Sequence, residues 1–162
     1  MGIKMKKIII MGLPGSGKTT LALELKKKLP AVHFNADEVR QNLNIDLAFS
    51  IEDRVEHARR MGWLCDKILE ANLYVIADFV CPTPETRAAF GVGGQNTFLI
   101  FVDRIPKGRF DDTNRIFIPP ENPDLTVTSS GTPQYWVSRV LGALKGLSNP
   151  NLGVAFASPS VK

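Results

Sequence analysis

Residues 12–19 constrain the fold of this chain more than any other part of its sequence. They read Gly-Leu-Pro-Gly-Ser-Gly-Lys-Thr and match the pattern G-x-x-x-x-G-K-[ST] at every fixed position. The apolar residues 8–11 come directly before them, as expected for a strand buried on both faces, and a helix pattern follows. In this setting the glycines let the backbone wrap a phosphate with several N–H groups. We call residues 12–19 the phosphate loop.

Strand and helix patterns alternate along the rest of the chain. Leucines at every fourth position predict a helix over residues 19–29, ended by Pro30. Further helices are predicted to begin at Ser50 and at Thr132, and strands are predicted at residues 32–34, 74–77, 97–102 and, more weakly, 125–128. Such alternation predicts the α/β fold of P-loop NTPases, with three layers, α/β/α, and a mostly parallel sheet. We expect residues 1–147 to form the domain and residues 148–162 a tail of unassigned role.

Composition excludes several protein classes. With 44% hydrophobic and 22% charged residues, the chain can bury a core and is not of the disordered type. No apolar run approaches the roughly 20 residues that span a bilayer, and the run at residues 8–11 is too short for a signal peptide. Cys65 and Cys81 have no disulfide or metal-ligand spacing. We therefore expect a cytoplasmic protein that does not bind membranes.

The excess of basic residues has a local origin. Residues 1–30 hold seven lysines and one glutamate, whereas the whole chain has a net charge of +4. The positive charge thus gathers around the phosphate loop, and no basic stripe interleaved with aromatic residues accompanies it. We do not expect nucleic acid to be a partner.

The phosphate loop predicts that the chain binds ATP and Mg²⁺. In such loops the lysine, here Lys18, reaches the β- and γ-phosphates, and the hydroxyl of Thr19 is a ligand of Mg²⁺. No N-K-x-D segment, which reads guanine in Ras-type GTPases, occurs in the chain, and its length suits a small kinase. The predicted ATP-binding residues are Gly12, Leu13, Pro14, Gly15, Ser16, Gly17, Lys18, Thr19 and Thr20.

Acidic residues follow three of the predicted strands. Asp37, Asp78 and Asp103 all stand at predicted carboxyl ends, where parallel sheets bind their ligands. Asp37 can accept the proton of an acceptor hydroxyl or help to hold Mg²⁺, and Arg40 can bind an anion through two hydrogen bonds. We predict that Lys18 and Asp37 are catalytic. The alternative for Asp37 and Arg40 is a surface ion pair.

From residue 12 to about residue 90 the chain resembles the adenylylsulfate kinase family, which phosphorylates the 3′-hydroxyl of adenylyl sulfate. Beyond the phosphate loop, the similarity lies in four short blocks. Residues 35–40 compare with D-G-D-N-V-R, residues 43–50 with L-N-R-D-L-G-F-S, residues 52–56 with E-D-R-V-E, and residues 79–82 with F-I-S-P. Residues 110–123 also align without a gap to F-T-G-I-D-D-P-Y-E-A-P-E-N-P, and there mainly the flanks match.

The resemblance implies a reaction and a set of substrate contacts. ATP and adenylyl sulfate would give ADP and 3′-phosphoadenylyl sulfate, and the enzyme would be a homodimer. Asp37 would position the ribose hydroxyl and Mg²⁺, Arg40 and Arg54 would grip the phosphosulfate, and Phe79 and Phe110 would sandwich the adenine. For each phenylalanine the alternative is ordinary core packing. The full predicted substrate-binding set is Arg40, Asn44, Phe49, Arg54, Phe79, Lys107 and Phe110.

Three single residues depart from the family pattern. Asn35 replaces the first aspartate of D-G-D, whereas Asp78 stands where the family usually has a small neutral residue. Our hypothesis is that Asp78 restores the lost charge, so that Thr19, Asp37 and Asp78 would be the metal-binding residues. Cys81 replaces the serine of F-I-S-P, which favours direct in-line transfer over a phosphorylated intermediate.

The largest departure is a deletion. Six residues separate Asp103 from Phe110, where the family has a lid of roughly two dozen residues that closes over the site. Lys107 or Arg109, within these six residues, is expected to reach phosphate. Two alternatives stay open for this reason: a kinase acting on another hydroxyl, such as that of a nucleoside, nucleotide or polynucleotide end, and an ATP sensor without catalytic activity.

Overall fold

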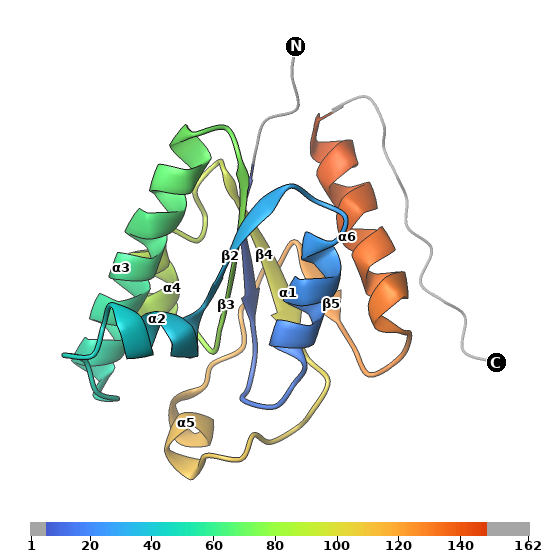
Figure 1. The fold of residues 1–162 in the computed structure, drawn as a ribbon. Coiled ribbons are helices and arrows are strands. Elements are labelled where there is room, and N and C mark those ends of the chain that lie inside the picture. The colour runs from blue at the N-terminus through green and yellow to red at the C-terminus, as the bar shows by residue number, and fades with distance from the viewer. Residues whose placement is uncertain (1–5, 149–162) are drawn as a thin grey trace.

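Within residues 6–148 the sheet has five strands, and every strand pair is parallel. The structure is a computed structural model that describes residues 6–148 (Figure 1). The order across the sheet is β2-β3-β1-β4-β5, so the strand that leads into the phosphate loop is central. This confirms the predicted fold class. The strands are β1 (Lys7–Met11), β2 (Ala31–Asn35), β3 (Tyr74–Phe79), β4 (Thr97–Val102) and β5 (Leu125–Val127).

Helices cover both faces of the sheet (Figure 1). Alternate residues of β1 point to opposite faces, which explains the apolar run at residues 8–11: Ile8 belongs to one core and Ile9 to the other. One face packs against α1 (Lys18–Lys26) and α6 (Pro133–Ser148), and the other against α2 (Ala36–Asn42), α3 (Ile51–Glu70) and α4 (Pro84–Phe90). The short α5 (Asp111–Ile116) lies beyond the carboxyl ends of the strands, on the side where the phosphate loop follows β1 (Figure 1).

Two predicted helix starts are confirmed by their caps. The hydroxyl of Ser50 accepts a hydrogen bond from the Asp53 amide at 3.1 Å, and that of Thr132 accepts one from the Tyr135 amide at 3.1 Å. The first helix was predicted too long: α1 ends at Lys26, and a turn precedes Pro30, whose ring disfavours helical geometry in the residue before it. Residues 149–162 of the predicted tail lie outside the described residues.

The strand register places two candidate residues, Asn35 and Asp78, side by side at the carboxyl ends of their strands. Asp78 pairs with Ile10 of β1 on one side and with Asn35 of β2 on the other. The phosphate loop, which follows β1, therefore begins close to Asn35 and Asp78.

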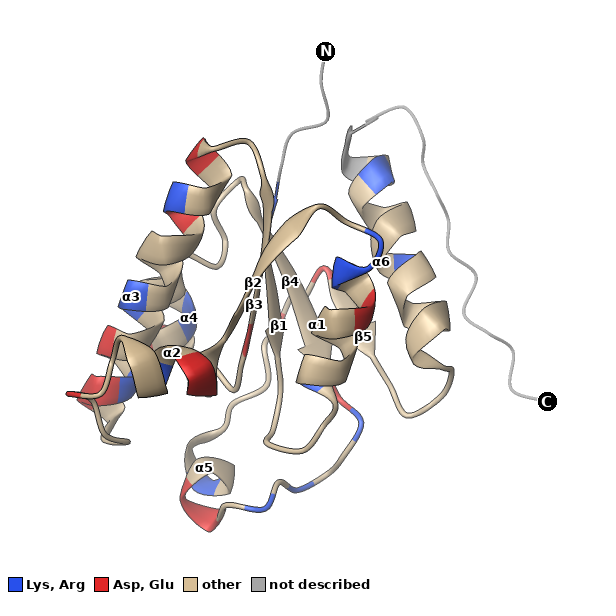
Figure 2. Cartoon of the chain, viewed as in Figure 1, with Lys and Arg blue, Asp and Glu red and all other residues tan. Residues whose placement is uncertain are grey.

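Charged residues of both signs occur on the helices and loops within residues 6–148 (Figure 2). Acidic and basic residues alternate along α3, and basic residues occur in the loop between β4 and α5 (Figure 2). None of the helices within residues 6–148 is both long and apolar enough to cross a bilayer.

Candidate active site

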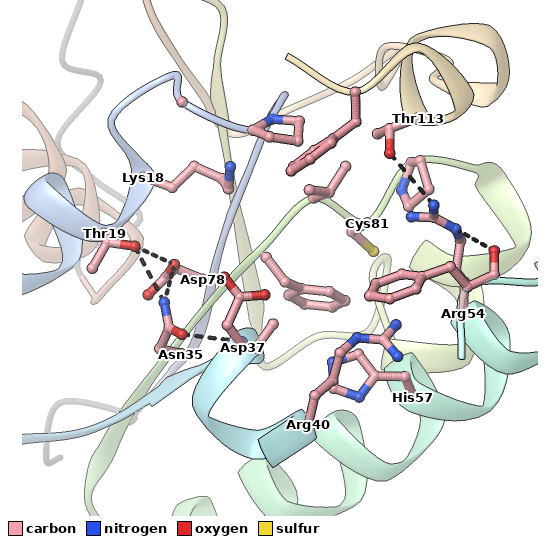
Figure 3. A pocket seen from close by; sticks show the side chains of 18 of the residues that line it. Lys18, Thr19, Asn35, Asp37, Arg40, Arg54, His57, Asp78, Cys81 and Thr113 are labelled. Carbon is pink, nitrogen blue, oxygen red and sulfur yellow. Dashed lines mark hydrogen bonds between the residues drawn. The ribbon is translucent and has the colours of Figure 1, made fainter. Parts of the chain in front are cut away.

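A cavity of about 530 Å³ opens at the carboxyl ends of β1, β2 and β3. One wall is the phosphate loop and the start of α1. The opposite wall comes from α2, α3 and the segment leading into α5 (Figure 3). The residues that line it are Pro14, Gly15, Gly17, Lys18, Thr19, Thr20, Asn35, Ala36, Asp37, Arg40, Phe49, Arg54, His57, Asp78, Phe79, Val80, Cys81, Pro82, Thr86, Arg109, Phe110, Asp112 and Thr113.

The phosphate loop has the shape of an anion cradle. At Gly12 a Cβ atom would lie 2.6 Å from the carbonyl oxygen of Val102, so no larger residue fits, and Gly17 has a φ of 100°, which favours glycine. The hydroxyl oxygen of Ser16 is buried and has no hydrogen-bond partner among the described residues. A buried polar atom without a partner indicates a missing one, and a phosphate oxygen would satisfy it.

Lys18 extends from the first turn of α1 into the cavity (Figure 3). Its Nζ donates to the carbonyl oxygen of Leu13 at 2.9 Å, and its pKa is lowered to about 8. Burial is the main cause; Asp78 and Asp37 oppose the shift, and the positive charge of Arg109 adds to it. A phosphate anion in the loop would favour the charged form of Lys18 again.

Thr19, Asn35 and Asp78 form a hydrogen-bonded corner beside the phosphate loop (Figure 3). Thr19 Oγ1 donates to Asp78 Oδ1 at 2.9 Å, and the side-chain amide of Asn35 donates to the same carboxylate oxygen at 3.1 Å. No group of three or more His, Cys, Asp and Glu side chains forms a metal site within residues 6–148. One hydroxyl and one carboxylate nevertheless suit Mg²⁺, which is usually held by one or two protein oxygens together with phosphate oxygens and water.

Asp37 faces the cavity from the first turn of α2. The side-chain oxygen of Asn35 caps this helix by accepting from the amides of Asp37 at 3.0 Å and Glu38 at 3.1 Å. Asn35 therefore links the cap of α2 to the corner at Asp78. Neither Asp37 nor Arg40 forms an ion pair within the described part of the chain, so the alternative of a surface pair between them is wrong.

The two predicted phosphosulfate arginines lie around one aromatic ring. The guanidinium carbons of Arg40 and Arg54 are 4.6 and 5.4 Å from the centre of the Phe49 ring. Arg54 donates to the carbonyl oxygen of Phe49 at 3.0 Å and to the carboxylate of Asp112 at 3.1 Å. It thus connects α3 to α5 across the mouth of the cavity.

Phe79 and Phe110 line the same cavity from different segments. Phe79, the last residue of β3, is buried against Phe90, with the ring centres 5.3 Å apart. Phe110 precedes α5 and is 52% exposed, so it is not a core residue in this structure. Cys81 also lines the cavity, but complete burial raises the pKa of its thiol to about 12. The thiol stays protonated at neutral pH and is not a ready nucleophile.

Two predicted substrate contacts lie away from the cavity lining. Asn44 is buried behind the wall, where its amide nitrogen is 2.9 Å from His57 Nδ1. Lys107 is exposed and lies 3.6 Å from Asp111, whereas Arg109, two residues later, lines the cavity. The spacing alone could not decide between Lys107 and Arg109, because the course of the loop decides which side chain points inward.

The loop of residues 104–109, which connects β4 to the segment before α5, is fastened to the rest of the site. The backbone of Gly108 makes two hydrogen bonds to the side-chain amide of Asn114, at 2.9 and 2.8 Å. A Cβ at Gly108 would lie 3.1 Å from Pro14 Cδ, which shows how closely the loop packs on the phosphate loop. We call residues 104–109 the short loop.

His57 is a cavity residue that the sequence reasoning missed. It stands one helical turn after Arg54 on α3, which was the available signal, and only 3% of it is exposed. Burial, with the nearby charges of Arg40 and Arg60, lowers its pKa to about 4. His57 is therefore neutral at pH 7.

We expect His57 to make the protein sensitive to acid. In the unfolded chain it takes up a proton near its ordinary pKa of 6.5, but in the folded protein only near pH 4. Its contribution to stability is thus complete above pH 6.5 and is lost as the pH falls towards 4. Between pH 7 and pH 4.5, the unfolding free energy should fall by about 2–3 kcal/mol more in the unaltered protein than in His57→Gln. Denaturant unfolding of both proteins at the two pH values measures this, and equal losses would contradict it.

Comparison with known proteins gives consistent matches. The family model described as adenylylsulphate kinase matches residues 4–108. The adenylyl-sulfate kinase of Staphylococcus epidermidis is 30% identical over 171 residues, covering 89% of this chain and 86% of the relative. The bifunctional enzyme NodQ of Rhizobium meliloti is 35% identical over 146 residues, covering 74% of this chain but 23% of NodQ, so the chain spans about a quarter of such relatives. A solved structure of the Mycobacterium tuberculosis APS kinase CysC in complex with AMPPNP and APS superposes with a TM-score of 0.78 and 25% identity, covering 89% of this chain and 99% of that one.

Proposed function

The chain belongs to the adenylylsulphate kinase family, and we propose that it transfers the γ-phosphoryl group of ATP to the 3′-hydroxyl of adenylyl sulfate. The products would be ADP and 3′-phosphoadenylyl sulfate. One observation carries this proposal: a triphosphate cradle and a pair of arginines beside aromatic side chains open into the same cavity. A nucleotide sensor would need the triphosphate cradle but not the arginine pair and the aromatic side chains beside it.

In the proposed mechanism the phosphate loop holds ATP through backbone N–H groups and the hydroxyl of Ser16. Lys18 and Arg109 place positive charge next to the transferring group. Arg40 and Arg54 bind the phosphosulfate, and Phe79 and Phe110 hold the adenine of the acceptor. These side chains would bring the 3′-hydroxyl next to Asp37 and in line with the γ-phosphorus.

Transfer would then be direct. Asp37 accepts the proton of the 3′-hydroxyl as a bond forms between that oxygen and the γ-phosphorus. The bond from the γ-phosphorus to the β–γ bridging oxygen breaks, and ADP leaves. Cys81 has no step in this sequence, because its thiol is buried and protonated.

We propose that Mg²⁺ is held by Thr19 and Asp78, with Asp37 close by. The donor set fits, since both side chains offer oxygen ligands at the edge of the cradle. When bound, Mg²⁺ supplies positive charge that offsets the charge of the β- and γ-phosphate oxygens. Thr19, Asp78 and Asn35 hold this corner in place through the hydrogen bonds described above.

The decisive experiment is an acceptor panel. ADP release from ATP is measured with adenylyl sulfate, with nucleosides and nucleotides, with an oligonucleotide, and with no acceptor. Acceptor-dependent release with adenylyl sulfate, together with formation of 3′-phosphoadenylyl sulfate, is the expected result. Release with another hydroxyl compound alone would replace the proposed acceptor, and nucleotide binding without any acceptor-dependent release would favour the sensor.

We expect Arg54→Ala to raise the KM for adenylyl sulfate by about 10- to 100-fold, because it removes a charge-assisted contact to the acceptor. The KM for ATP should change little, since Arg54 lies on the wall opposite the phosphate loop. Steady-state kinetics with each substrate varied in turn measures the difference. Arg59→Ala is the matched control on the same helix, because Arg59 is exposed and pairs with Glu56. An unchanged acceptor KM in Arg54→Ala would remove Arg54 from the site.

The expected homodimer and the expected cytoplasmic location stay predictions, as does the division into residues 1–147 and a tail. Sedimentation of the purified chain with and without nucleotide would measure the oligomeric state directly.

A further inference from the structure

The carboxylate of Asp78 is buried and fully provided with hydrogen-bond donors. Only 2% of the residue is exposed. Its Oδ1 accepts from Thr19 and Asn35, and its Oδ2 is in hydrogen-bond contact with Nε2 of His33. A buried carboxylate without such partners would be costly, because it loses its hydration. The three donors come from two elements: Thr19 lies on α1, and His33 and Asn35 lie on β2. Together they fix the rotation of the carboxylate.

Strand register explains why His33 can reach this carboxylate. Asn35 lies directly opposite Asp78, and His33 lies opposite Ile76, two residues earlier on β3. His33 and Asn35 therefore share one face of β2, and His33 is the diagonal neighbour of Asp78 on that face. Diagonal neighbours are within reach of a long or aromatic side chain.

The hydrogen-bond pattern fixes the role of the imidazole. As a ligand of a cation Asp78 would be ionised and could only accept hydrogen bonds, so Nε2–H of His33 would then be the donor to Oδ2. Oδ1 is then left for the hydroxyl of Thr19. Because this hydroxyl donates a hydrogen bond to Asp78, a lone pair of Thr19 Oγ1 stays available to a cation at the edge of the phosphate loop.

We propose that His33 is a positioning residue of the metal corner, which orients Asp78 so that Asp78 in turn orients Thr19. Asp78 stands directly across the register pair from Asn35, and His33 supports its carboxylate there. This inference rests on the proposed binding of a divalent cation with the nucleotide. It does not depend on which acceptor is phosphorylated.

The test measures the affinity of Mn²⁺ with ADP, with Mn²⁺ standing in for Mg²⁺ and the bound metal read by electron paramagnetic resonance. His33→Leu should weaken the metal affinity of the ADP complex by about 10- to 100-fold, the usual cost of losing an outer partner of a metal ligand. His33→Gln should recover most of it, because its amide nitrogen can still donate to Asp78. The affinity for ADP without metal should be the same in all three proteins.

Val32→Ala is the matched control for a merely structural effect. Val32 lies on the same strand with its side chain on the opposite face. The substitution should lower the melting temperature and leave the metal affinity unchanged. Equal metal affinities of His33→Leu and the unaltered protein, or equal losses in the leucine and glutamine variants, would overturn the proposal.

A reciprocal exchange gives a second, independent result. The double variant Asn35→Asp/Asp78→Asn returns the carboxylate to β2 and leaves an amide on β3. In that background His33→Leu should change the metal affinity less than threefold, because His33 no longer faces a carboxylate. A loss as large as in the unaltered background would overturn the proposal. If the protein binds Mn²⁺ and ADP as expected but does not phosphorylate adenylyl sulfate, only the proposed function fails.

Discussion

Lys18→Ala is expected to lower kcat by about 100- to 1,000-fold while the protein stays folded. Lys18 is the one lysine that lines the cavity in the described part of the chain, and it extends from the cradle towards the acceptor side. Removing a fixed positive charge from the place where charge develops during transfer typically costs a factor of about 100 to 1,000, and ATP binding is weakened as well.

The folded state should tolerate this change. Burial already lowers the pKa of Lys18 to about 8, which means that the folded protein is a poor environment for its charge. Removing the amine relieves that cost, so the melting temperature should stay the same or rise. Lys26→Ala on the same helix is the matched control, since Lys26 is exposed at the other end of α1. Turnover above a tenth of normal in Lys18→Ala would show that the phosphate loop does not serve phosphoryl transfer.

Asp37→Asn is expected to lower kcat by about 100- to 10,000-fold, which is the range for losing a positioned general base. The substitution keeps the shape of the side chain but removes its ability to take a proton. Because Asp37 holds its place through the cap of α2, which uses backbone groups, the helix should form as before.

The kinetic parameters distinguish this role from a role in binding. We expect kcat to fall while the KM for adenylyl sulfate changes little. Glu38→Gln is the matched control, because Glu38 is the next residue of α2, is exposed and does not line the cavity. A large rise in KM with a normal kcat would instead make Asp37 a substrate-binding residue.

Local patterns predicted the elements that surround the phosphate loop, because each carried a strong signal of its own. Residues 8–11 of β1 are all apolar since both faces of the strand are buried, and Ser50 and Thr132 cap their helices as their positions suggest. Three short helices, α2, α4 and α5, were not predicted. For α4 the signal was present, since Thr83 caps the helix and Pro84 opens it. For α5 there is no side-chain cap and only six residues, so its position depends on contacts with the rest of the fold.

The candidate site was predictable where one segment supplies several residues, and less so where distant segments meet. The phosphate loop and Asp37 fall into the first group. His33 was invisible from the sequence because its partner Asp78 lies 45 positions away, and only the register of β2 and β3 brings the two together. Asn44 shows the reverse case, in which a residue from a recognisable block supports a cavity residue from behind instead of lining the cavity.

The two hydrogen bonds between Asn114 and Gly108 have a consequence for how the proposed reaction would divide ATP between transfer and hydrolysis. A mobile cover shields the transferring phosphoryl group from water until the acceptor has arrived. The short loop is instead tied down by two hydrogen bonds and packed on Pro14, so it forms a standing wall. In the proposed reaction, water would then compete with the acceptor hydroxyl throughout the cycle. The occupancy of the acceptor subsite, more than any closing movement, would set the ratio of productive transfer to futile hydrolysis.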